Sequence, residues 1–363
     1  MTLETHEQRA RLIIGSYTDS LPHVVAKGKG ISVLEVDGAT GRIEPVTTFS
    51  ELRNPTYLSL SNDGRVLYAV EELAEKDGAD AATLSFDAAS AKLAVAGKVP
   101  VYGDWPCHIS TDRDGKRLFV SNYLSGNFVT YALDADGRPE GQGISIQRSG
   151  TGSNPDRQEG PHVHQATATL DNRHVLVCDA GTDEIAAYPL TEALIGMKPD
   201  FVANSKGGAL PRHLVISNDG KRVFVIHELG CLVTSYALGA DGLELLAEAS
   251  TLPEDFRGES ACAAIRLHPN GRFLYASNRG HDSIAAFEIG EADGSLTRIG
   301  WYGTRGQTPR DFAVAPSGGF LVVANQDSDS LAVFLLDQQT GALKAVGDTY
   351  EIGSPVCVLF AKS

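Results

Sequence analysis

The sequence predicts an all-β fold, a seven-bladed β-propeller with four antiparallel strands in each blade. Three observations predict it. A segment recurs in which a turn residue precedes an apolar, β-prone run, and a polar residue ends the run seven positions after the turn residue. The ends of successive copies lie 47 to 57 residues apart. No helical periodicity separates them, and four short strands per repeat of this length are typical of a propeller blade.

Six complete copies of this segment predict the second strand of six blades. They read SNDGRVLYAVE, DRDGKRLFVSN, LDNRHVLVCD, SNDGKRVFVIH, HPNGRFLYASN and APSGGFLVVAN. Their turn residues are Gly64, Gly115, Asn172, Gly220, Gly271 and Gly318, and their runs end at Glu71, Asn122, Asp179, His227, Asn278 and Asn325. We expect the ends Asn122, Asp179, Asn278 and Asn325 to cap hairpins by bonding backbone amides.

Three further strands complete each predicted blade. An extended segment precedes the turn, as in NPTYLSLS, WPCHISTD, ALPRHLVIS and QTPRDFAVA. A third strand follows, as in GISVLEV, FVTYAL, SIAAFEI and SLAVFLL. Turns such as DGATGR, DADGR, EADGS and DQQTG then lead into a fourth strand.

The two ends of the chain predict one shared blade. A seventh copy, LIIGS, ends at Ser16 without a strand before it, and the segment 354–360, SPVCVLF, is of the missing type. Pairing of these N- and C-terminal strands closes the ring and leaves no open sheet edge between the termini. We therefore expect residues 1–363 to form a single propeller domain, with residues 1–10 as a flexible N-terminal tail.

Composition excludes several classes of function. The chain has 31 basic and 46 acidic residues, a net charge of −15, which disfavours nucleic acid as a partner. No apolar run is long enough to span a membrane, and the opening MTLETHEQRARL lacks the apolar core of a signal peptide, so we expect a cytoplasmic protein without membrane contact. The five widely spaced cysteines favour buried thiols over disulfides.

Strand connectivity predicts which side chains share one rim of the propeller, because the innermost strand starts where the second strand ends. Eight residues before each turn residue stand Thr56, Cys107, His164, Arg212, Ala263 and Arg310, with Val356 on the closing strand. One residue past each second strand stand Tyr17, Glu72, Tyr123, Ala180, Glu228, Arg279 and Gln326. A single charged residue on a rim is usually only solvated. The gathering of His164, Arg212, Glu228, Arg279 and Arg310 in neighbouring blades predicts a basic site in an acidic protein.

Neither a metal nor a cofactor is expected at this rim. No phosphate-binding loop, dinucleotide fingerprint or nucleophile elbow occurs in a suitable context. His162, His164 and His213 are the imaginable metal ligands, but their spacing does not support imidazoles that face one another. His162 is less well placed by register than His164, and we expect it to orient its loop.

The motifs at these positions resemble a known family. They are GPHVH at 160–164, PRHLVISNDG at 211–220, HEL at 227–229, IRLHPNGRFLYASNRGHDSIAAF at 265–287 and TPRDFAVAPSGGFLVVANQDSDSLAVF at 308–334. In this order they resemble the bacterial lactonase family of seven-bladed propellers, which includes cycloisomerase-type 6-phosphogluconolactonases and carboxy-cis,cis-muconate cyclases. The resemblance implies an active site of His164, Arg212, Glu228 and Arg279, with Arg266 as a competitor for the last place.

The implied activity is hydrolysis of 6-phosphogluconolactone to 6-phosphogluconate, a step of the pentose phosphate pathway. His164 would be the general base, Arg212 would support the oxyanion or a carboxylate, and Glu228 would orient either of them or bind sugar hydroxyls. Arg279 and Arg310 would hold the phosphate. His162, His213 and Gln326 are further candidates for substrate binding.

Two alternatives stay open on the sequence. The same cluster suits another aldonic or carboxylated lactone, including reversible lactonisation of the muconate type. A non-enzymatic propeller that serves as a scaffold or binding module is the other, because the fold by itself defines no chemistry. In the enzymatic interpretations the partner is a small anionic lactone, and the protein is a monomer or weak dimer.

Overall fold

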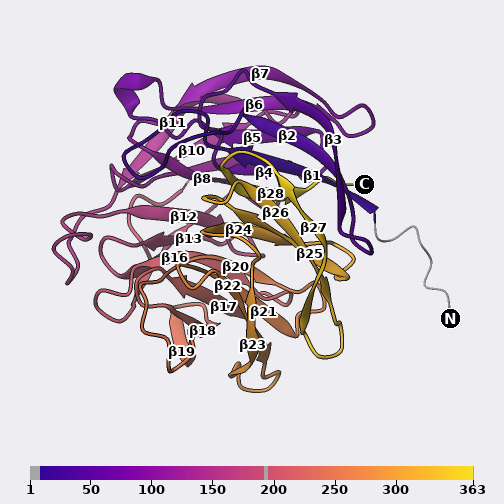
Figure 1. Cartoon of the computed structure of the whole chain (residues 1–363). Coiled ribbons are helices and arrows are strands. Elements are labelled where there is room, and N and C mark those ends of the chain that lie inside the picture. Colours follow the sequence, from indigo (N-terminus) through magenta and orange to yellow (C-terminus); the bar gives the residue numbers. More distant parts are fainter. Residues whose placement is uncertain (1–8, 192–194, 363) are drawn as a thin grey trace. The chain divides into compact units, whose positions relative to one another are not determined.

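The structure, a computed structural model, describes residues 9–191 and 195–362. The strands of these residues form seven four-stranded antiparallel sheets, which confirms the predicted all-β, seven-bladed propeller (Figure 1). Within the described ranges the one helical element is a short 3-10 turn, η1 (Glu75–Asp77). The chain forms two compact units. One comprises the described residues up to 55, residues 231–233 and those from 247 onward, and the other comprises 56–230 and 234–246. The single-domain organisation stays a prediction.

The second unit holds four sheets, apart from short stretches of β18 and β19. They are β4 (Leu58–Leu60), β5 (Val66–Val70), β6 (Asp80–Asp87) and β7 (Lys92–Pro100); β8 (Pro106–Thr111), β9 (Arg117–Asn122), β10 (Asn127–Leu133) and β11 (Pro139–Gln147); β12 (Val163–Ala168), β13 (His174–Asp179), β14 (Glu184–Pro189) and β15 (Phe201–Asn204); and β16 (Pro211–Ile216), β17 (Arg222–His227), β18 (Leu232–Leu238) and β19 (Leu243–Ser250).

The first unit holds three sheets. They are β28 (Pro355–Phe360), β1 (Arg9–Ser16), β2 (Ile31–Asp37) and β3 (Arg42–Phe49); β20 (Ala261–Leu267), β21 (Phe273–Arg279), β22 (Ser283–Ile289) and β23 (Leu296–Gly303); and β24 (Pro309–Val314), β25 (Phe320–Asn325), β26 (Ser330–Leu336) and β27 (Leu343–Glu351).

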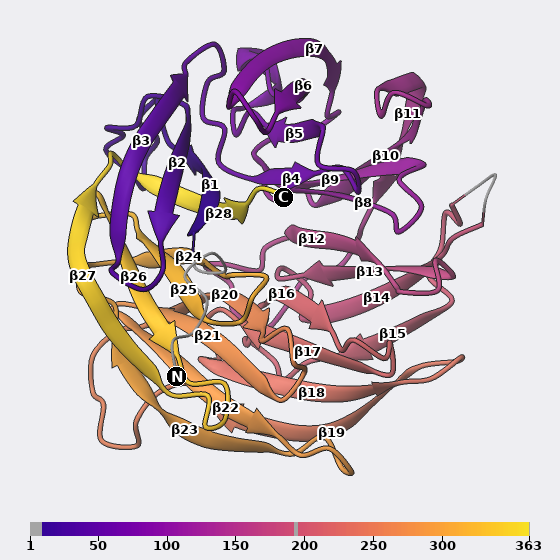
Figure 2. The ribbon, with the colours of Figure 1, turned by 90° about the vertical axis from the view of Figure 1, so that its right-hand side faces the viewer.

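One sheet of the first unit is built from both ends of the chain. Figure 2 shows β28, in yellow, beside β1, in indigo, and their antiparallel register joins Leu12 to Phe360. This confirms the predicted pairing. Residues 1–8 of the predicted tail lie outside the described residues, whereas Arg9 and Ala10 already belong to β1 and pair with β2. The expectation of a tail is therefore wrong at these two positions, because β2 extends far enough to hold them.

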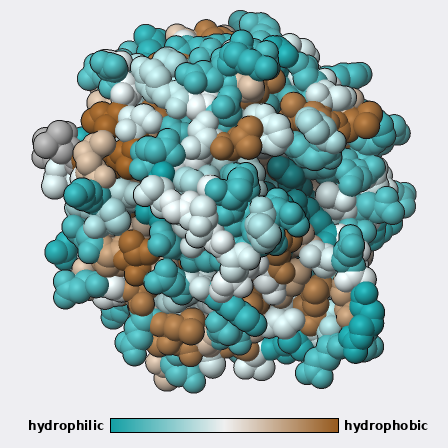
Figure 3. Space-filling view, turned by 90° about the vertical axis from the view of Figure 1, so that its left-hand side faces the viewer, coloured by the Kyte–Doolittle hydropathy of each residue, from teal (hydrophilic) through white to brown (hydrophobic). Residues whose placement is uncertain are grey.

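Within each unit the core lies between consecutive sheets, which is why the inner strands there are apolar on both faces. In the second unit Phe119, Phe128 and Val177 belong to one buried cluster. In the first unit Phe273 and Phe312 belong to another. Burying one such side chain contributes about 1.5–3 kcal/mol. All five cysteines are buried thiols, as predicted. On the surface in Figure 3, hydrophilic residues predominate and hydrophobic ones form small separate groups.

The predicted turn residues adopt the backbone that their type suggested. The φ angle is positive at Gly64, Gly115, Asn172, Gly220, Gly271 and Gly318. Glycine and asparagine occupy this left-handed region at lower cost than other residues. The hairpins that separate the first and second strands are therefore specified locally by the sequence.

The strand-end residues bond differently from the expectation. The side-chain amides of Asn122, Asn278 and Asn325 donate to the backbone carbonyls of residues 101, 251 and 304. Only Asp179 accepts from backbone amides, those of residues 162 and 181. The prediction is thus wrong for the asparagines, because their NH2 groups donate to backbone carbonyls instead of their oxygens accepting from backbone amides.

Candidate active site

The innermost strands carry β-bulges at their starts. In β12 the pairing with β13 passes from Val163 to Gln165, so His164 is the extra residue. The extra residue is Cys107 in β8, His164 in β12 and Arg212 in β16, and in the first unit Arg310 in β24 and Val356 in β28. A bulge turns its extra side chain away from the regular alternation, and bulges are over-represented near active sites. The rim residues predicted eight positions before the turns, together with Val356, form a first column, and five of these seven are therefore bulge residues.

The rim residues predicted one position past each second strand form a second column. Backbone hydrogen bonds hold members of this column close to members of the first. The amide of Glu228 donates to the carbonyl of Leu210 at 2.7 Å, and the amide of Tyr123 donates to the carbonyl of Trp105 at 3.0 Å. Each acceptor lies two residues before a bulge residue and has a positive φ, 59° at Leu210 and 55° at Trp105. Such a conformation costs a non-glycine residue about 1–2 kcal/mol. Strain is therefore stored where the predicted site residues lie.

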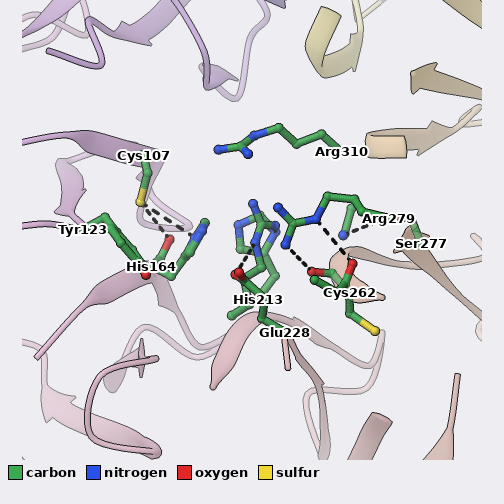
Figure 4. A network of polar contacts seen from close by, with 12 residues as sticks. Cys107, Tyr123, His164, His213, Glu228, Cys262, Ser277, Arg279 and Arg310 are labelled. Atoms are coloured by element: carbon green, nitrogen blue, oxygen red, sulfur yellow. Dashed lines mark hydrogen bonds and ion pairs between the residues drawn. The ribbon is translucent and has the colours of Figure 1, made fainter. Parts of the chain in front are cut away.

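His164 is buried among polar and aromatic groups of the second unit. Its side chain lies with Nδ1 3.7 Å from the Sγ atom of Cys107 (Figure 4). Its ring meets those of His213 and Tyr123 edge to face, with centroid distances of 4.9 and 5.6 Å. The predicted rim residue is thus enclosed rather than merely solvated, since it is only 5% exposed.

Two of the three histidines considered as metal ligands, His164 and His213, meet edge to face, contrary to expectation. The His213 ring contacts His164 and also His108, at a centroid distance of 5.7 Å. The prediction is wrong because the bulges break the simple alternation on which the spacing argument relied. Nη1 of Arg212 lies 3.4 Å from Nδ1 of His213. A guanidinium only donates, so this nitrogen of His213 is the acceptor and carries no proton in that contact.

Glu228 lies between two arginines. Its Oε2 is 3.4 Å from Nε of Arg212, and its Oε1 accepts a hydrogen bond of 3.0 Å from Nη2 of Arg157. Nη2 of Arg157 also donates to the hydroxyl of Tyr123 at 3.1 Å. Burial opposes the charge of Arg157, but the Glu228 carboxylate and Tyr123 outweigh it and raise the pKa of Arg157. Burial, followed by the Glu228 charge, raises the pKa of Tyr123. Arg157 is therefore held in its charged form beside the Glu228 carboxylate.

His162 packs against Tyr123 and supports the cluster from outside. The two rings are stacked at 4.6 Å, and Nδ1 of His162 donates to the carbonyl of Tyr123 at 3.0 Å. Nε2 lies 3.2 Å from the carboxylate of Glu159. The backbone amide of His162 donates to Asp179 at 2.8 Å. These contacts fit the expected role of orienting the loop better than direct binding of a substrate.

The remaining predicted site residues belong to the first unit. Nη2 of Arg279 donates to the carbonyl of Cys262 at 2.8 Å (Figure 4). Nη2 of Arg310 donates to the hydroxyl of Tyr17 at 3.1 Å, and its guanidinium lies 5.6 Å from the centre of that ring. Gln326 is 4% exposed. The roles of Arg279, Arg310 and Gln326 stay predictions.

Arg266, the competitor of Arg279, forms an ion pair of 2.5 Å with Asp311. The other carboxylate oxygen of Asp311 accepts the amide of Val358 at 2.9 Å. This network joins β20, β24 and β28, so Arg266 has a place in the packing of the inner strands. The ion pair therefore favours Arg279 as the site arginine of this repeat.

Sequence reasoning did not identify Arg157, and it gave no role to Cys107 or Tyr123. Cys107 and Tyr123 stand in the two predicted columns, so their positions were available. Arg157 lies in a loop outside the repeat. Among residues 9–191 and 195–362, no three His, Cys, Asp or Glu side chains are arranged to hold a metal ion.

The fold and the site together define an all-β propeller in which an imidazole lies near an arginine and carboxylate cluster. The chain belongs to the family described as lactonase, 7-bladed β-propeller, whose model matches residues 11–360. It is 30% identical over 301 residues to the 6-phosphogluconolactonase of Bacillus subtilis, covering 82% of this chain and 83% of that one. It is 32% identical over 309 residues to the 6-phosphogluconolactonase of Formosa agariphila, covering 84% and 86%.

Among solved structures, the chain is similar to the periplasmic gluconolactonase PpgL of Pseudomonas aeruginosa. The TM-score is 0.89 at 30% identity, and the match covers 98% of this chain and 99% of that one. In the part of the chain that the structure describes, no helix has the length and apolar character needed to cross a membrane.

Proposed function

We propose that the protein is a lactonase that hydrolyses a sugar-acid lactone, with 6-phosphogluconolactone as its substrate and 6-phosphogluconate as its product. One observation carries the proposal. The buried His164 contacts His213, which contacts Arg212, which in turn pairs with Glu228. Family membership and relatives named 6-phosphogluconolactonase support it.

The chemistry needs a base, a cation at the developing oxyanion and a group for the leaving oxygen. In the proposed reaction His164 takes a proton from water, and the resulting hydroxide adds to the lactone carbonyl. Arg212 stabilises the oxyanion with its N–H groups. Collapse of the intermediate breaks the ring C–O bond, and the ring oxygen takes the proton back from His164. The products are a carboxylic acid, which ionises, and a hydroxyl group.

Glu228 has a positioning role in this proposal. With Arg212 on one oxygen and Arg157 on the other, it fixes the Arg212 guanidinium before substrate arrives. Prepositioned charge costs no reorganisation at the moment of reaction, which is what makes such groups effective.

A direct assay tests the proposal. Freshly generated 6-phosphogluconolactone is supplied and its spontaneous hydrolysis is subtracted. The variant His164→Ala should lose at least about 100-fold in kcat, since a positioned general base contributes about 10²–10⁴-fold. The control His174→Gln, whose imidazole pairs with Asp200 at 3.1 Å on a different part of the fold, should retain activity. Full activity of the His164→Ala variant overturns the assignment.

The gluconolactonase name of the Pseudomonas structure favours an unphosphorylated lactone as the second candidate substrate. Turnover of gluconolactone against its 6-phosphate separates the two. The proposed reaction uses no metal or cofactor, so dialysis against a chelator should leave the rate unchanged. Cytoplasmic location and a monomer or weak dimer stay predictions.

A further inference from the structure

Arg157 is fixed by a loop that the repeat does not contain. The loop, residues 148–162, connects β11 to β12. Its anchor is Gln158, which is 1% exposed. The Gln158 side chain donates to the carbonyl of Ala180 at 2.9 Å and accepts the amide of Asn154 at 2.9 Å. The backbone carbonyl of Gln158 accepts the amide of Gly152 at 3.1 Å. The residue before this anchor, Arg157, is therefore held at a defined place.

Arg157 is also the cation of this cluster that reaches solvent. Its side chain is 37% exposed, whereas that of Glu228 is 8% exposed and that of Arg212 is 4% exposed. Both printed bonds of Arg157 use Nη2, one to Tyr123 and one to Glu228. A guanidinium has five N–H donors. Within the described ranges the donors on Nε and Nη1 meet no protein acceptor, so an incoming ligand finds three of them available.

The arginines of the cluster suit an anion. Arg157 and Arg212 carry two positive charges beside the buried carboxylate of Glu228, and the exposed carboxylate of Glu159 also interacts with Arg157. Hydrogen bonds from a guanidinium to a phosphate or carboxylate are among the stronger ones in proteins. The chain as a whole carries a charge of −15, so two arginines in one cluster are unusual for it.

We propose that Arg157 binds the negatively charged substituent of the lactone and selects anionic over neutral lactones. The inference rests on the proposed function and adds a specificity residue that neither the repeat nor the family motifs indicated. Arg279 and Arg310, to which the sequence gave the phosphate, bond a backbone carbonyl and a tyrosine in the first unit. Arg157 shares its unit with His164.

The experiment compares kcat/KM for 6-phosphogluconolactone and gluconolactone. The variant Arg157→Gln should lose about tenfold or more on the phosphorylated lactone, because hydrogen bonds to charged groups are the more costly ones to lose. It should lose less than about threefold on the neutral lactone. Arg157→Lys should recover part of the preference. The matched control is Arg65→Gln, whose arginine is exposed and paired with Asp63 in a distant hairpin of the same unit.

Equal losses on both lactones overturn the inference, because they mean that Arg157 acts only through Glu228. Unchanged selectivity overturns it as well. If the wild type hydrolyses neither lactone, the proposed function fails, and calorimetric titration with 6-phosphogluconate and gluconate decides about Arg157. Tighter binding of the phosphorylated compound that is lost in the Arg157→Gln variant supports the inference. Binding of neither compound, or equal binding of both, overturns it.

Discussion

Replacing Arg148 by alanine should destabilise the protein by about 3–5 kcal/mol, the usual cost of leaving one partner of a buried ion pair alone. The Arg148 side chain is 6% exposed, and its Nε lies 3.0 Å from Oδ2 of Asp179, which is fully buried. It also pairs with Glu184 and donates to the hydroxyl of Tyr188. Burial opposes the charge of Arg148, but its bond to Tyr188 and the charge of Asp179 outweigh this and raise its pKa.

The effect should extend to the candidate site. The second oxygen of Asp179 accepts the amides of His162 and Gly181, at 2.8 and 3.1 Å. An uncompensated Asp179 must draw in water or a proton, and either change disturbs the segment that leads into His164. We therefore expect the Arg148→Ala variant to lose lactonase activity as well as stability.

Urea unfolding followed by circular dichroism measures the change in unfolding free energy of the Arg148→Ala variant. The control is Arg42→Ala, whose arginine is 74% exposed and pairs with Glu44 at 2.5 Å. Exposed pairs contribute at most about 1 kcal/mol, so this variant should be close to wild type. The reasoning is refuted if the Arg148→Ala variant loses less than about 1 kcal/mol of unfolding free energy while the slope of that free energy against urea concentration is unchanged. An unchanged slope means that variant and wild type expose the same amount of surface on unfolding, so their free energies can be compared.

Two further outcomes are expected. Burial lowers the pKa of His227 to about 4, so between pH 6.5 and 4 the unfolded chain binds a proton that the folded chain does not. Acidification through this window should lower the unfolding free energy by up to about 3 kcal/mol. Urea titrations at pH 7 and 4.5 should show a smaller fall in unfolding free energy for the His227→Asn variant than for the wild type. An equal fall in both proteins contradicts the assignment. A Cβ at Gly181 would lie 2.0 Å from the carbonyl oxygen of Gly160, whereas one at Gly160 meets nothing within 4 Å. Gly181→Ala should therefore reduce melting temperature and activity, while Gly160→Ala should change neither, and equal effects contradict the steric argument.

The sequence was informative wherever the repeat extends. The turn residues, the second strands and the pairing of 354–360 with the N-terminal strand follow from local patterns that seven copies reinforce. Counting from the turns also singled out His164, Arg212 and Glu228, which the structure brings into one cluster, whereas their catalytic roles stay predictions. Seven copies of one pattern identify the shared strand and turn positions even where a single copy deviates, so the strand register can be predicted from the sequence.

The side-chain contacts of the candidate site were harder to predict from the sequence than the strands and turns. The bulges at Cys107, His164 and Arg212 shift side chains out of the strict in-and-out alternation of a strand. No residue type in the sequence predicts a bulge of this kind. The facing imidazoles depend on those bulges. Arg157 lies in a polar insertion, GSNPDRQEG, that has no counterpart to align with, although its position just before GPHVH was a usable signal.

The blade shared by β1 and β28 has a consequence for biosynthesis. β1 precedes its neighbour β28 in the chain, and the strands of all six other sheets lie between them. Until β28 has been synthesised, the edge of β1 that later pairs with β28 therefore has no strand partner. An open strand edge can pair with other chains. An incompletely folded chain in which this edge is unpaired is prone to misassembly, and the native pairing with β28 removes the exposed edge.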